Sequence, residues 1–515
     1  MRRTAVTVML LLVATLLPAG AATADPKGPG PLPDQASAQA TAALTAVKEA
    51  LAGKGKADPK GLSTLLLDLE MASADLTPEQ QLEAERLTPR VDGGGGSATV
   101  NGRQKTTLEG LCSGAVCVWR FDDQDHPHHS TLAYAEQALL EANKVLNRAD
   151  AMNYRAPRVV SSDRVHSDPF VTNWPIAGGR LNIALVNLGA NGYYGYCTPV
   201  QGTVTRRHGT APAFCAIDND MAEFTLQTPL NNVRVTLAHE LFHAVQYAYD
   251  YGADKWLMEA TATWFEERFA PDVKDNRQFL PLGQAARPLK PLDRFGPQSY
   301  GNWAFFEFLS QKHGNGVVRQ VWNQTAQGRH SIRALQRVLN RGKRGGLARN
   351  YAHFGSVNRR PRSFYADHGT FPTAPVQATR RMAARTQKSR NARYSTKVNQ
   401  LTSKTAVFNI RRKGINSRKW RLVVNVSGPA RATNPGAHAL IVMRNGNIRH
   451  RQINLNRFGN GRVAIGMRRG KVARVFVTVA NGSSRFTCDR GTLRACQGRP
   501  RDNGKAFAVH AQLRR

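Results

Sequence analysis

The chain has 515 residues, of which 41% are hydrophobic and 21% are charged, and its formal net charge is +36. This apolar content is enough for two or three hydrophobic cores and excludes an intrinsically disordered chain. After the first residues no stretch reaches about 18 uninterrupted apolar positions, so no transmembrane helix is expected there.

Residues 1–24 have the pattern of a secretory signal peptide. Arg2 and Arg3 precede an apolar run that is too short to span a membrane, and small residues ending at Ala24 follow it, which predicts cleavage after Ala24. No cysteine follows the run to carry a lipid anchor. We therefore expect a secreted, extracellular protein without a transmembrane anchor.

Residues 25–110 are predicted to form a helical N-terminal extension. The segment TPEQQLEAERL begins with a residue suited to cap a helix, and the glycine-rich stretch DGGGGSA at 92–98 forms a flexible break after it. Such a segment is either a removable pro-region or an extension that stays attached. The sequence favours neither alternative.

Residues 111–315 mix strand and helix patterns. Strands are predicted at AVCVWRF and RLNIALVNL, with an amphipathic helix, STLAYAEQALLEANKVLN, between them. Three further helices are predicted at 231–250, 254–269 and 299–312. These patterns indicate an α+β domain.

The predicted helix at 231–250 contains LAHELFHAVQ. It is apolar over most of its circumference, yet Thr236, His239, Glu240, His243 and Gln246 form a polar stripe, and buried polar groups need partners. Residues four apart lie on one helical face, so the two imidazoles can bind one zinc ion at about 2.0 to 2.1 Å. Glu240 is then placed to take a proton from a water on that ion. The motif predicts two metal ligands, His239 and His243, and a catalytic base, Glu240.

The next predicted helix, KWLMEATATWFEER, offers Glu259 as a third ligand. The short polar link YGADK lets this helix fold back antiparallel, which brings Glu259 against the histidine pair. Glu266 and Glu267 are alternatives. Because they lie nearer the helix end and beside Arg268, they are interpreted as part of a solvated face.

The two segments LAHELFHAVQ and WLMEATATW together resemble the gluzincin branch of the zinc metallopeptidases. More closely, they resemble secreted bacterial metalloproteases in which HExxHAVQ is followed by a Trp-containing helix that carries a glutamate; the resemblance covers about residues 180–310. It implies a zincin-like catalytic domain, with His239, His243 and Glu259 as zinc ligands and Glu240 as general base.

Three positions depart from the patterns of related families. Metzincins would need glycine where this chain has Gln246 and histidine where it has Tyr249, so that branch is excluded. Thermolysin-like enzymes carry an aspartate that orients the first histidine at the place of Thr263, so the group that orients His239 is left open. Tyr300, in YGNWAFFEFL, resembles the place of an oxyanion donor; a packed or capping tyrosine is the alternative.

Two further polar clusters are weaker metal candidates. The stretch DDQDHPHHS holds several aspartates and three histidines, but it precedes a helix, whose dipole favours acidic residues without a metal. In IDNDMAEF, Asp218 and Asp220 offer oxygen ligands to calcium, yet a turn or helix cap is the favoured interpretation because the EF-hand spacing is absent.

The C-terminal part is strongly basic. Residues 316–515 contain 43 Lys and Arg but only three acidic residues, Asp367, Asp489 and Asp502. Residues 316–402 are predicted to be a basic helical or linker region, and 403–515 a basic β-sandwich-like domain, because apolar runs such as RLVVNV alternate with Asn-Gly turns there. Such a charge favours an anionic partner, such as a cell-wall polymer or nucleic acid outside the cell.

Six cysteines lie in three sequence-local pairs, 112 with 117, 197 with 215 and 488 with 496. An oxidising compartment favours three disulfides, although six cysteines allow 15 pairings. Taken together, the sequence predicts a secreted zinc endopeptidase with a basic β-domain. The alternatives are an exported polyanion-binding protein with an inactive zincin domain and a zinc hydrolase of cell-wall peptides.

Overall fold

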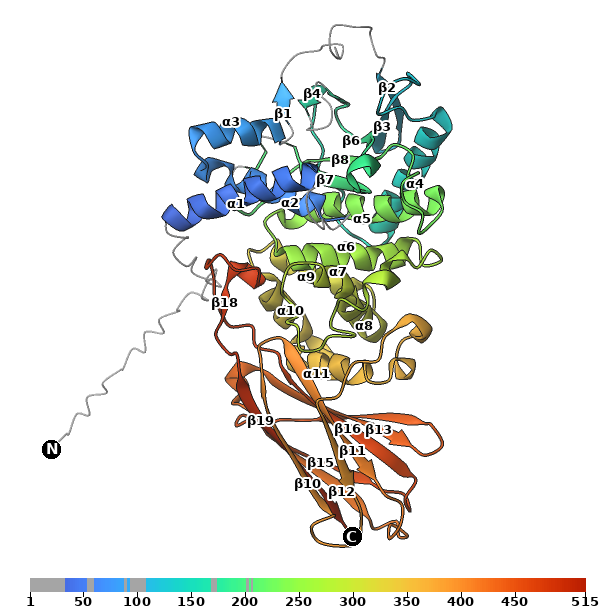
Figure 1. The fold of residues 1–515 in the computed structure, drawn as a ribbon, viewed down its shortest axis with the longest axis vertical. Coiled ribbons are helices and arrows are strands. Elements are labelled where there is room, and N and C mark those ends of the chain that lie inside the picture. Colours follow the sequence, from blue (N-terminus) through green and yellow to red (C-terminus); the bar gives the residue numbers. More distant parts are fainter. Residues whose placement is uncertain are drawn as a thin grey trace, which may run out of the picture.

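A computed structural model describes residues 33–52, 60–87, 90–92, 108–167, 174–200, 203–204 and 207–515. The predicted signal peptide at 1–24 and the glycine-rich break lie outside these residues, apart from Asp92. Along the long axis of the molecule, helices and one mixed sheet occupy one end and a β-rich region occupies the other (Figure 1). The fold is therefore mixed α/β with a C-terminal all-β region of several sheets.

The first part is built on a five-stranded sheet in the order β2-β3-β6-β8-β7. Its strands are β2 (Leu108–Ser113), β3 (Val116–Phe121), β6 (Leu181–Val186), β7 (Gly195–Pro199) and β8 (Ala213–Asp218). Strands β3, β6 and β8 are parallel, and β7 runs antiparallel to β8 at the edge. A small sheet of β1 (Arg90–Asp92), β4 (Arg164–Ser167) and β5 (Trp174–Ile176) accompanies it.

Helices cover both faces of the five-stranded sheet. On β6, Ile183 and Leu185 join the core formed with α4 (Leu132–Ala151) and α5 (Pro229–Asp250), whereas Ala184 and Val186 join a second core. The second core is built with the N-terminal helices α1 (Pro33–Leu51), α2 (Leu62–Ala72) and α3 (Pro78–Leu87). Burial on both faces explains why β6 has an almost continuous apolar sequence.

The helices after α5 extend the first core. They are α6 (Lys255–Phe269), α7 (Gln298–Gly301), α8 (Trp303–His313), α9 (Gly316–Thr325), α10 (Ser331–Leu339) and α11 (Leu347–Val357). Trp322 of α9, Leu335 of α10 and Tyr351 of α11 are buried in the same core as α5 and α6. Residues 316–402, predicted to be a basic helical or linker region, thus begin with helices whose apolar faces complete the core of the first part.

The β-rich region contains two sheets around one core. One has the order β14-β13-β16-β11-β9 and the other β10-β19-β12-β15. The first is formed by β9 (Ala378–Met382), β11 (Thr402–Ile410), β13 (Pro435–Met443), β14 (Ile448–Ile453) and β16 (Val472–Asn481). The second is formed by β10 (Asn391–Val398), β12 (Arg421–Ser427), β15 (Asn460–Gly466) and β19 (Lys505–Arg514).

The β-rich region begins earlier than residue 403. Strands β9 and β10 lie within residues 316–402, which were predicted to be a basic helical or linker region, and both are edge strands. Edge strands bury only part of their surface, so ATRRM and NARYSTKV carry many polar residues and lack a strong apolar pattern.

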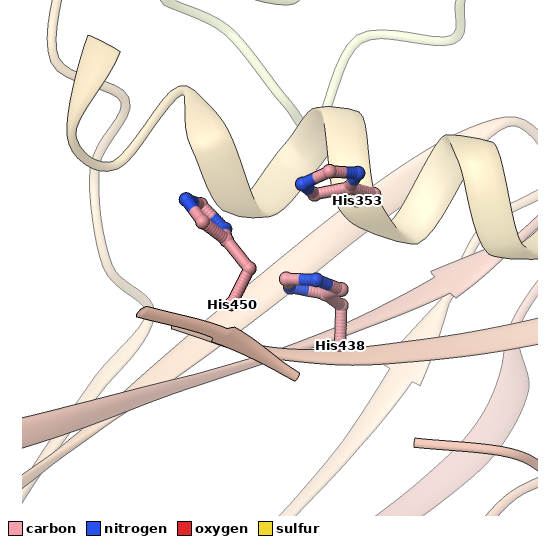
Figure 2. A group of neighbouring side chains, drawn as sticks. All are labelled: His353, His438 and His450. Atoms are coloured by element: carbon pink, nitrogen blue, oxygen red, sulfur yellow. The ribbon is translucent and has the colours of Figure 1, made fainter. Parts of the chain in front are cut away.

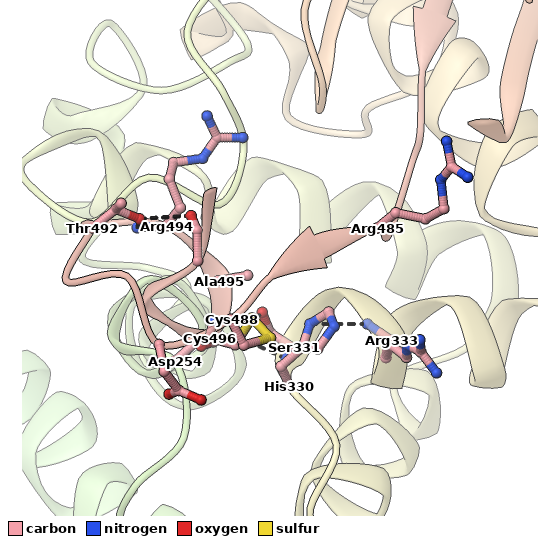
Figure 3. The surroundings of a disulfide bond; sticks show 12 residues. Asp254, His330, Ser331, Arg333, Arg485, Cys488, Thr492, Arg494, Ala495 and Cys496 are labelled. Carbon is pink, nitrogen blue, oxygen red and sulfur yellow. Dashed lines mark hydrogen bonds between the residues drawn. A yellow bond between two sulfur atoms is a disulfide. The ribbon is translucent and has the colours of Figure 1, made fainter. Parts of the chain in front are cut away.

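Three disulfides confirm the sequence-local pairing: Cys112–Cys117, Cys197–Cys215 and Cys488–Cys496. The third closes a loop between β17 (Phe486–Thr487) and β18 (Arg499–Pro500) that returns from the β-rich region to the helices. There Asp254, at the start of α6, accepts hydrogen bonds from the backbone N–H groups of Cys496 (2.6 Å) and Ser331 (2.8 Å) (Figure 3). This loop therefore holds the N-terminus of α6.

Among the described residues, no helix is long and apolar enough to cross a membrane.

Candidate metal centre

Helix α5 carries the HELFH motif through the middle of the first core. Thr228 caps the helix by accepting a hydrogen bond from Asn231 N, and Pro229 occupies its first turn. Every residue from 235 to 250 is buried, which agrees with an apolar circumference interrupted by a polar stripe. Helix α6 packs directly against α5, and its residues from Trp256 to Glu266 are buried.

One nitrogen each from His239 and His243 and one oxygen from Glu259 lie within 4.8 Å of one another. His239 Nε2 is 3.3 Å and His243 Nε2 is 3.8 Å from Glu259 Oε2, and all three side chains are fully buried. Ligands at about 2.1 Å around a tetrahedral ion lie roughly 3.4 Å apart, so these separations suit a metal such as zinc. The structure thus brings together the three residues predicted to bind metal.

Hydrogen bonds on the far side of each ring fix where the imidazole protons lie. Gln246 Nε2 donates to Met258 O (3.0 Å) and Thr261 Oγ1 (3.1 Å), so its Oε1 accepts from His243 Nδ1 (2.8 Å). His239 Nδ1 donates to Glu266 Oε1 at 2.7 Å. Both Nε2 atoms therefore point their lone pairs toward the Glu259 carboxylate.

The converging atoms form a group that could hold a metal ion. Burial lowers the pKa of His243 to about 3, with His239 contributing, and burial also lowers the pKa of His239 well below its usual range. The rings are therefore neutral, and His243 Nε2 has no hydrogen-bond partner among the described residues. Two imidazoles and a carboxylate in this arrangement fit a divalent metal.

Glu266 does not lie on a solvated face, contrary to the sequence interpretation. Its side chain is 2% exposed, and its Oε1 accepts from both His239 Nδ1 and Lys60 Nζ (3.0 Å). Lys60 also pairs with Asp275 Oδ2 at 3.0 Å. Glu266 lies two helical turns after Glu259, so it reaches the same side of α6 and takes the orienting role that Thr263 does not fill.

Glu267 is also not solvated, but it lies outside the ligand cluster. Its side chain is 11% exposed and is paired with Arg277 at 2.8 Å. The solvated-face interpretation failed for both glutamates because α6 is enclosed on all sides and not only along one stripe.

Glu240 lies beside the ligands and is bound by the N-terminal extension. Its Oε2 accepts from Ser63 Oγ of α2 at 2.8 Å. Burial raises the pKa of Glu240 to about 8, and the hydrogen bond from Ser63 opposes this rise. Ser63 Oγ in turn accepts from Cys197 N of the edge strand β7 at 2.9 Å.

Tyr300 lies next to the cluster. Its ring stacks near that of His239, with a centroid distance of 5.9 Å and an angle of 20°, and the residue is 2% exposed. It comes from the short helix α7, which packs against α6. Tyr300 is therefore close enough to the metal ligands to face a group bound there.

The two weaker metal candidates have structural explanations. His126 stacks on Phe121 at 3.7 Å, and His128 Nδ1 accepts from Asn187 N. Asp218 lies near Asp220 and Glu223, but its carboxylate accepts backbone N–H groups of Gly189 (2.6 Å) and Met221 (2.7 Å). Asp218 thus caps turns, in agreement with the turn or cap interpretation that the sequence favoured over a calcium site.

Sequence reasoning missed Glu266 as an orienting group and Lys60 as its partner. The seven-residue spacing between Glu259 and Glu266 was a usable signal, because it places both on one helical face. Lys60 lies 206 residues from Glu266, and nothing local in the sequence indicated that contact.

A model of a family of unknown function (DUF6055) matches residues 210–347. The match runs from β8 to α10 and contains all three candidate ligands, together with Glu240, Glu266 and Tyr300. It includes neither Lys60 and Ser63 of the N-terminal extension nor the β-rich region. No curated protein matches the chain.

Proposed function

We propose that the protein is a secreted, zinc-dependent endopeptidase of gluzincin type. The observation that carries this proposal is the convergence of His239 Nε2, His243 Nε2 and Glu259 Oε2, with the Glu240 carboxylate beside them. Zinc, when bound there, supplies Lewis-acid polarisation of water and of the peptide carbonyl. His239, His243 and Glu259 would hold it.

The residues of the chain then have distinct tasks. Glu240 takes the proton of the attacking water and passes it to the amine that leaves. Glu266 and Gln246 keep the two imidazoles in the tautomer that presents Nε2. Tyr300 donates a hydrogen bond to the oxygen on which negative charge develops.

The edge strand β7 is the proposed binding edge for substrate. It is antiparallel and has one unpaired side, and extended peptides bind such edges by adding a strand. Cys197 N points to this side and donates to Ser63 Oγ, which also binds Glu240. Ser63 thus occupies a position between the edge strand and the base, where a substrate carbonyl would lie.

This arrangement favours the pro-region alternative for the N-terminal extension. All three candidate ligands and Glu240 are fully buried, and α2 packs against β7. A peptide cannot reach the site until α2 moves. We infer that α1–α3 hold the enzyme latent and that their displacement or removal activates it.

Casein zymography after limited proteolysis tests the activity, with and without a chelator. Glu240→Gln should keep zinc at the HELFH site, because Glu240 is not a ligand, while hydrolysis falls by about 10²- to 10⁴-fold. Loss of that zinc in the variant would contradict the role of Glu240 as base. Full activity in chelator would contradict the zinc mechanism.

Two alternatives have their own measurements. Activity on peptidoglycan peptides but not on casein would favour a cell-wall hydrolase. Metal binding without any hydrolysis after removal of α1–α3 would favour an inactive zincin domain in a polyanion-binding protein, a function that the 43 basic residues after position 315 support.

A further inference from the structure

Three histidines meet where helix α11 crosses the β-rich region. His353 lies on α11, His438 on β13 and His450 on β14 (Figure 2). In the register of β13 with β14, Leu440 lies opposite His450, two residues from His438. Side chains two apart on a strand share a face, so His438 and His450 project from the same face of the sheet, and α11 packs against it.

The three rings are close enough to share one ion. Their centroids are 4.4 Å (353–438), 5.1 Å (353–450) and 5.5 Å (438–450) apart. One nitrogen from each ring lies within 4.8 Å of the other two. His438 is 3% exposed, whereas His353 and His450 are half-buried, so solvent reaches the cluster from one side.

Buried nitrogens of two of these rings lack partners. His438 Nδ1 and His353 Nε2 make no hydrogen bond with the described residues, whereas the His450 ring interacts with the backbone of Ser363. Buried polar atoms are normally satisfied, and several unsatisfied atoms in one place indicate an unseen ion or water. Burial, together with neighbouring cationic groups, lowers the pKa of all three rings, to about 3 for His353.

The composition of the cluster limits what it can bind. No carboxylate belongs to the group, and Lys312 Nζ lies 3.2 Å from His353 Nδ1. Oxygen-seeking ions such as calcium and magnesium are therefore excluded, and a nearby positive charge weakens any cation site. Imidazole nitrogens suit zinc, copper and nickel. Burial lowers the pKa of Lys312 to about 8, which reduces the positive charge beside the cluster.

We propose that His353, His438 and His450 form a second transition-metal site, which ties α11 to the β-rich region. It is separate from the HELFH site and does not depend on the proposed peptidase activity. The three histidines come from three elements, and two of them are half-buried, so a zinc ion would have three protein ligands and a fourth position open to solvent. A metal there would link the helical part to the all-β part.

Zinc titration of the metal-stripped full chain tests the proposal. Mass spectrometry under native conditions should count two zinc ions per chain, and Glu259→Ala should retain one. His450→Ala in the Glu259→Ala background should then retain none. His510→Ala is the matched control, because His510 is a histidine of the β-rich region outside the cluster, and it should leave the zinc count unchanged.

A second readout separates loss of metal from loss of fold. Zinc should raise the Tm of Glu259→Ala, and this rise should disappear in the double variants with His450→Ala or His353→Gln. Cobalt in the Glu259→Ala chain should give the visible absorption of a histidine-bound ion. An unchanged zinc count and Tm rise after either histidine substitution would overturn the proposal. So would a folded Glu259→Ala chain that binds no zinc.

Discussion

At the residue scale, the carboxylates near the HELFH helix have different expected effects on zinc. Glu259→Ala removes one of three ligands and should abolish retention of zinc at this site against a competing chelator. Glu266→Ala removes only the hydrogen bond to His239 Nδ1, so we expect a loss of about 10- to 100-fold in zinc affinity. Glu267→Gln should have little effect, since Glu267 binds Arg277 instead.

Competition with a chromogenic chelator measures these affinities, in a His450→Ala background that isolates the HELFH site. If Glu267→Gln lost more zinc than Glu259→Ala, the assignment of the third ligand would be wrong. An unchanged affinity in Glu266→Ala would show that Glu266 does not orient His239.

The same residues show what a sequence can predict at this scale. His239, Glu240 and His243 lie within five positions on one helix, so helical periodicity alone places them together. Predicting Glu259 as a ligand required only that the short link after α5 let α6 fold back antiparallel to it. Lys60 and Ser63 lie in the N-terminal extension, remote in sequence, and their contacts with Glu266 and Glu240 depend on the packing of the whole first part.

At the element scale, the proposed latency depends on α2, which packs against β7 and bonds to Glu240 through Ser63. Ser63→Ala keeps a good helix former in α2 but removes the hydroxyl that links Glu240 to Cys197 N. Burial raises the pKa of Glu240 to about 8, so its carboxyl is mostly neutral at neutral pH. A hydrogen bond between neutral groups contributes about 0.5 to 1.5 kcal/mol, so the open state and the peptidase rate should rise by about 2- to 10-fold. Ser73→Ala is the matched control, because Ser73 bonds only to Glu70 O within its own segment.

Peptidase assays on a fluorogenic casein measure this rate for the unprocessed chain. Removal of α1–α3 by proteolysis should raise it further, and added peptide 60–87 should lower it again. A processed chain that is no more active than the full chain would show that α2 is not inhibitory.

Helices and strands with a strong apolar pattern could be predicted from the sequence, whereas strands with many polar residues could not. The long helices α4, α5 and α6 and the strand β6 agree closely with the expected segments, since α5, α6 and β6 are buried over most of their length and α4 buries one face. Strands β9 and β10 were missed because edge strands with exposed arginines lack that pattern. The packing of α9 to α11 into the first core was not predicted, because the basic composition of residues 316–402 suggested a helical or linker region and gave no contact with the first part.

At the scale of the whole molecule, the positive charge of residues 316–515 is largely uncompensated by acidic side chains. Its three acidic residues are already engaged: Asp367 pairs with Arg277, Asp489 with Arg207 and Asp502 with Arg485. Two of these pairs reach back to the first part of the chain. The arginines on the outer sheet surfaces therefore have few acidic neighbours, which favours binding of a polyanion.

The sheet β10-β19-β12-β15 offers a defined surface for a test. Arg393, His510, Asn425 and Arg462 form one row across its four strands, and both arginines are exposed. We expect the full chain to bind purified cell walls and polyphosphate at low salt. Because such binding comes from counterion release, a site with about six phosphate contacts should lose roughly 10³-fold in affinity between 50 and 200 mM salt.

Arg393→Glu with Arg462→Glu should weaken this binding and flatten its salt dependence, whereas Arg158→Glu with Arg164→Glu, exposed in the first part, should not. Co-sedimentation at several salt concentrations gives both affinity and slope for each variant. The full chain is the proper sample, because α9–α11 belong to the first core and a fragment that begins at residue 316 would cut through it. Equal weakening by both pairs would assign the binding to net charge alone, and salt-independent binding would rule out an electrostatic origin.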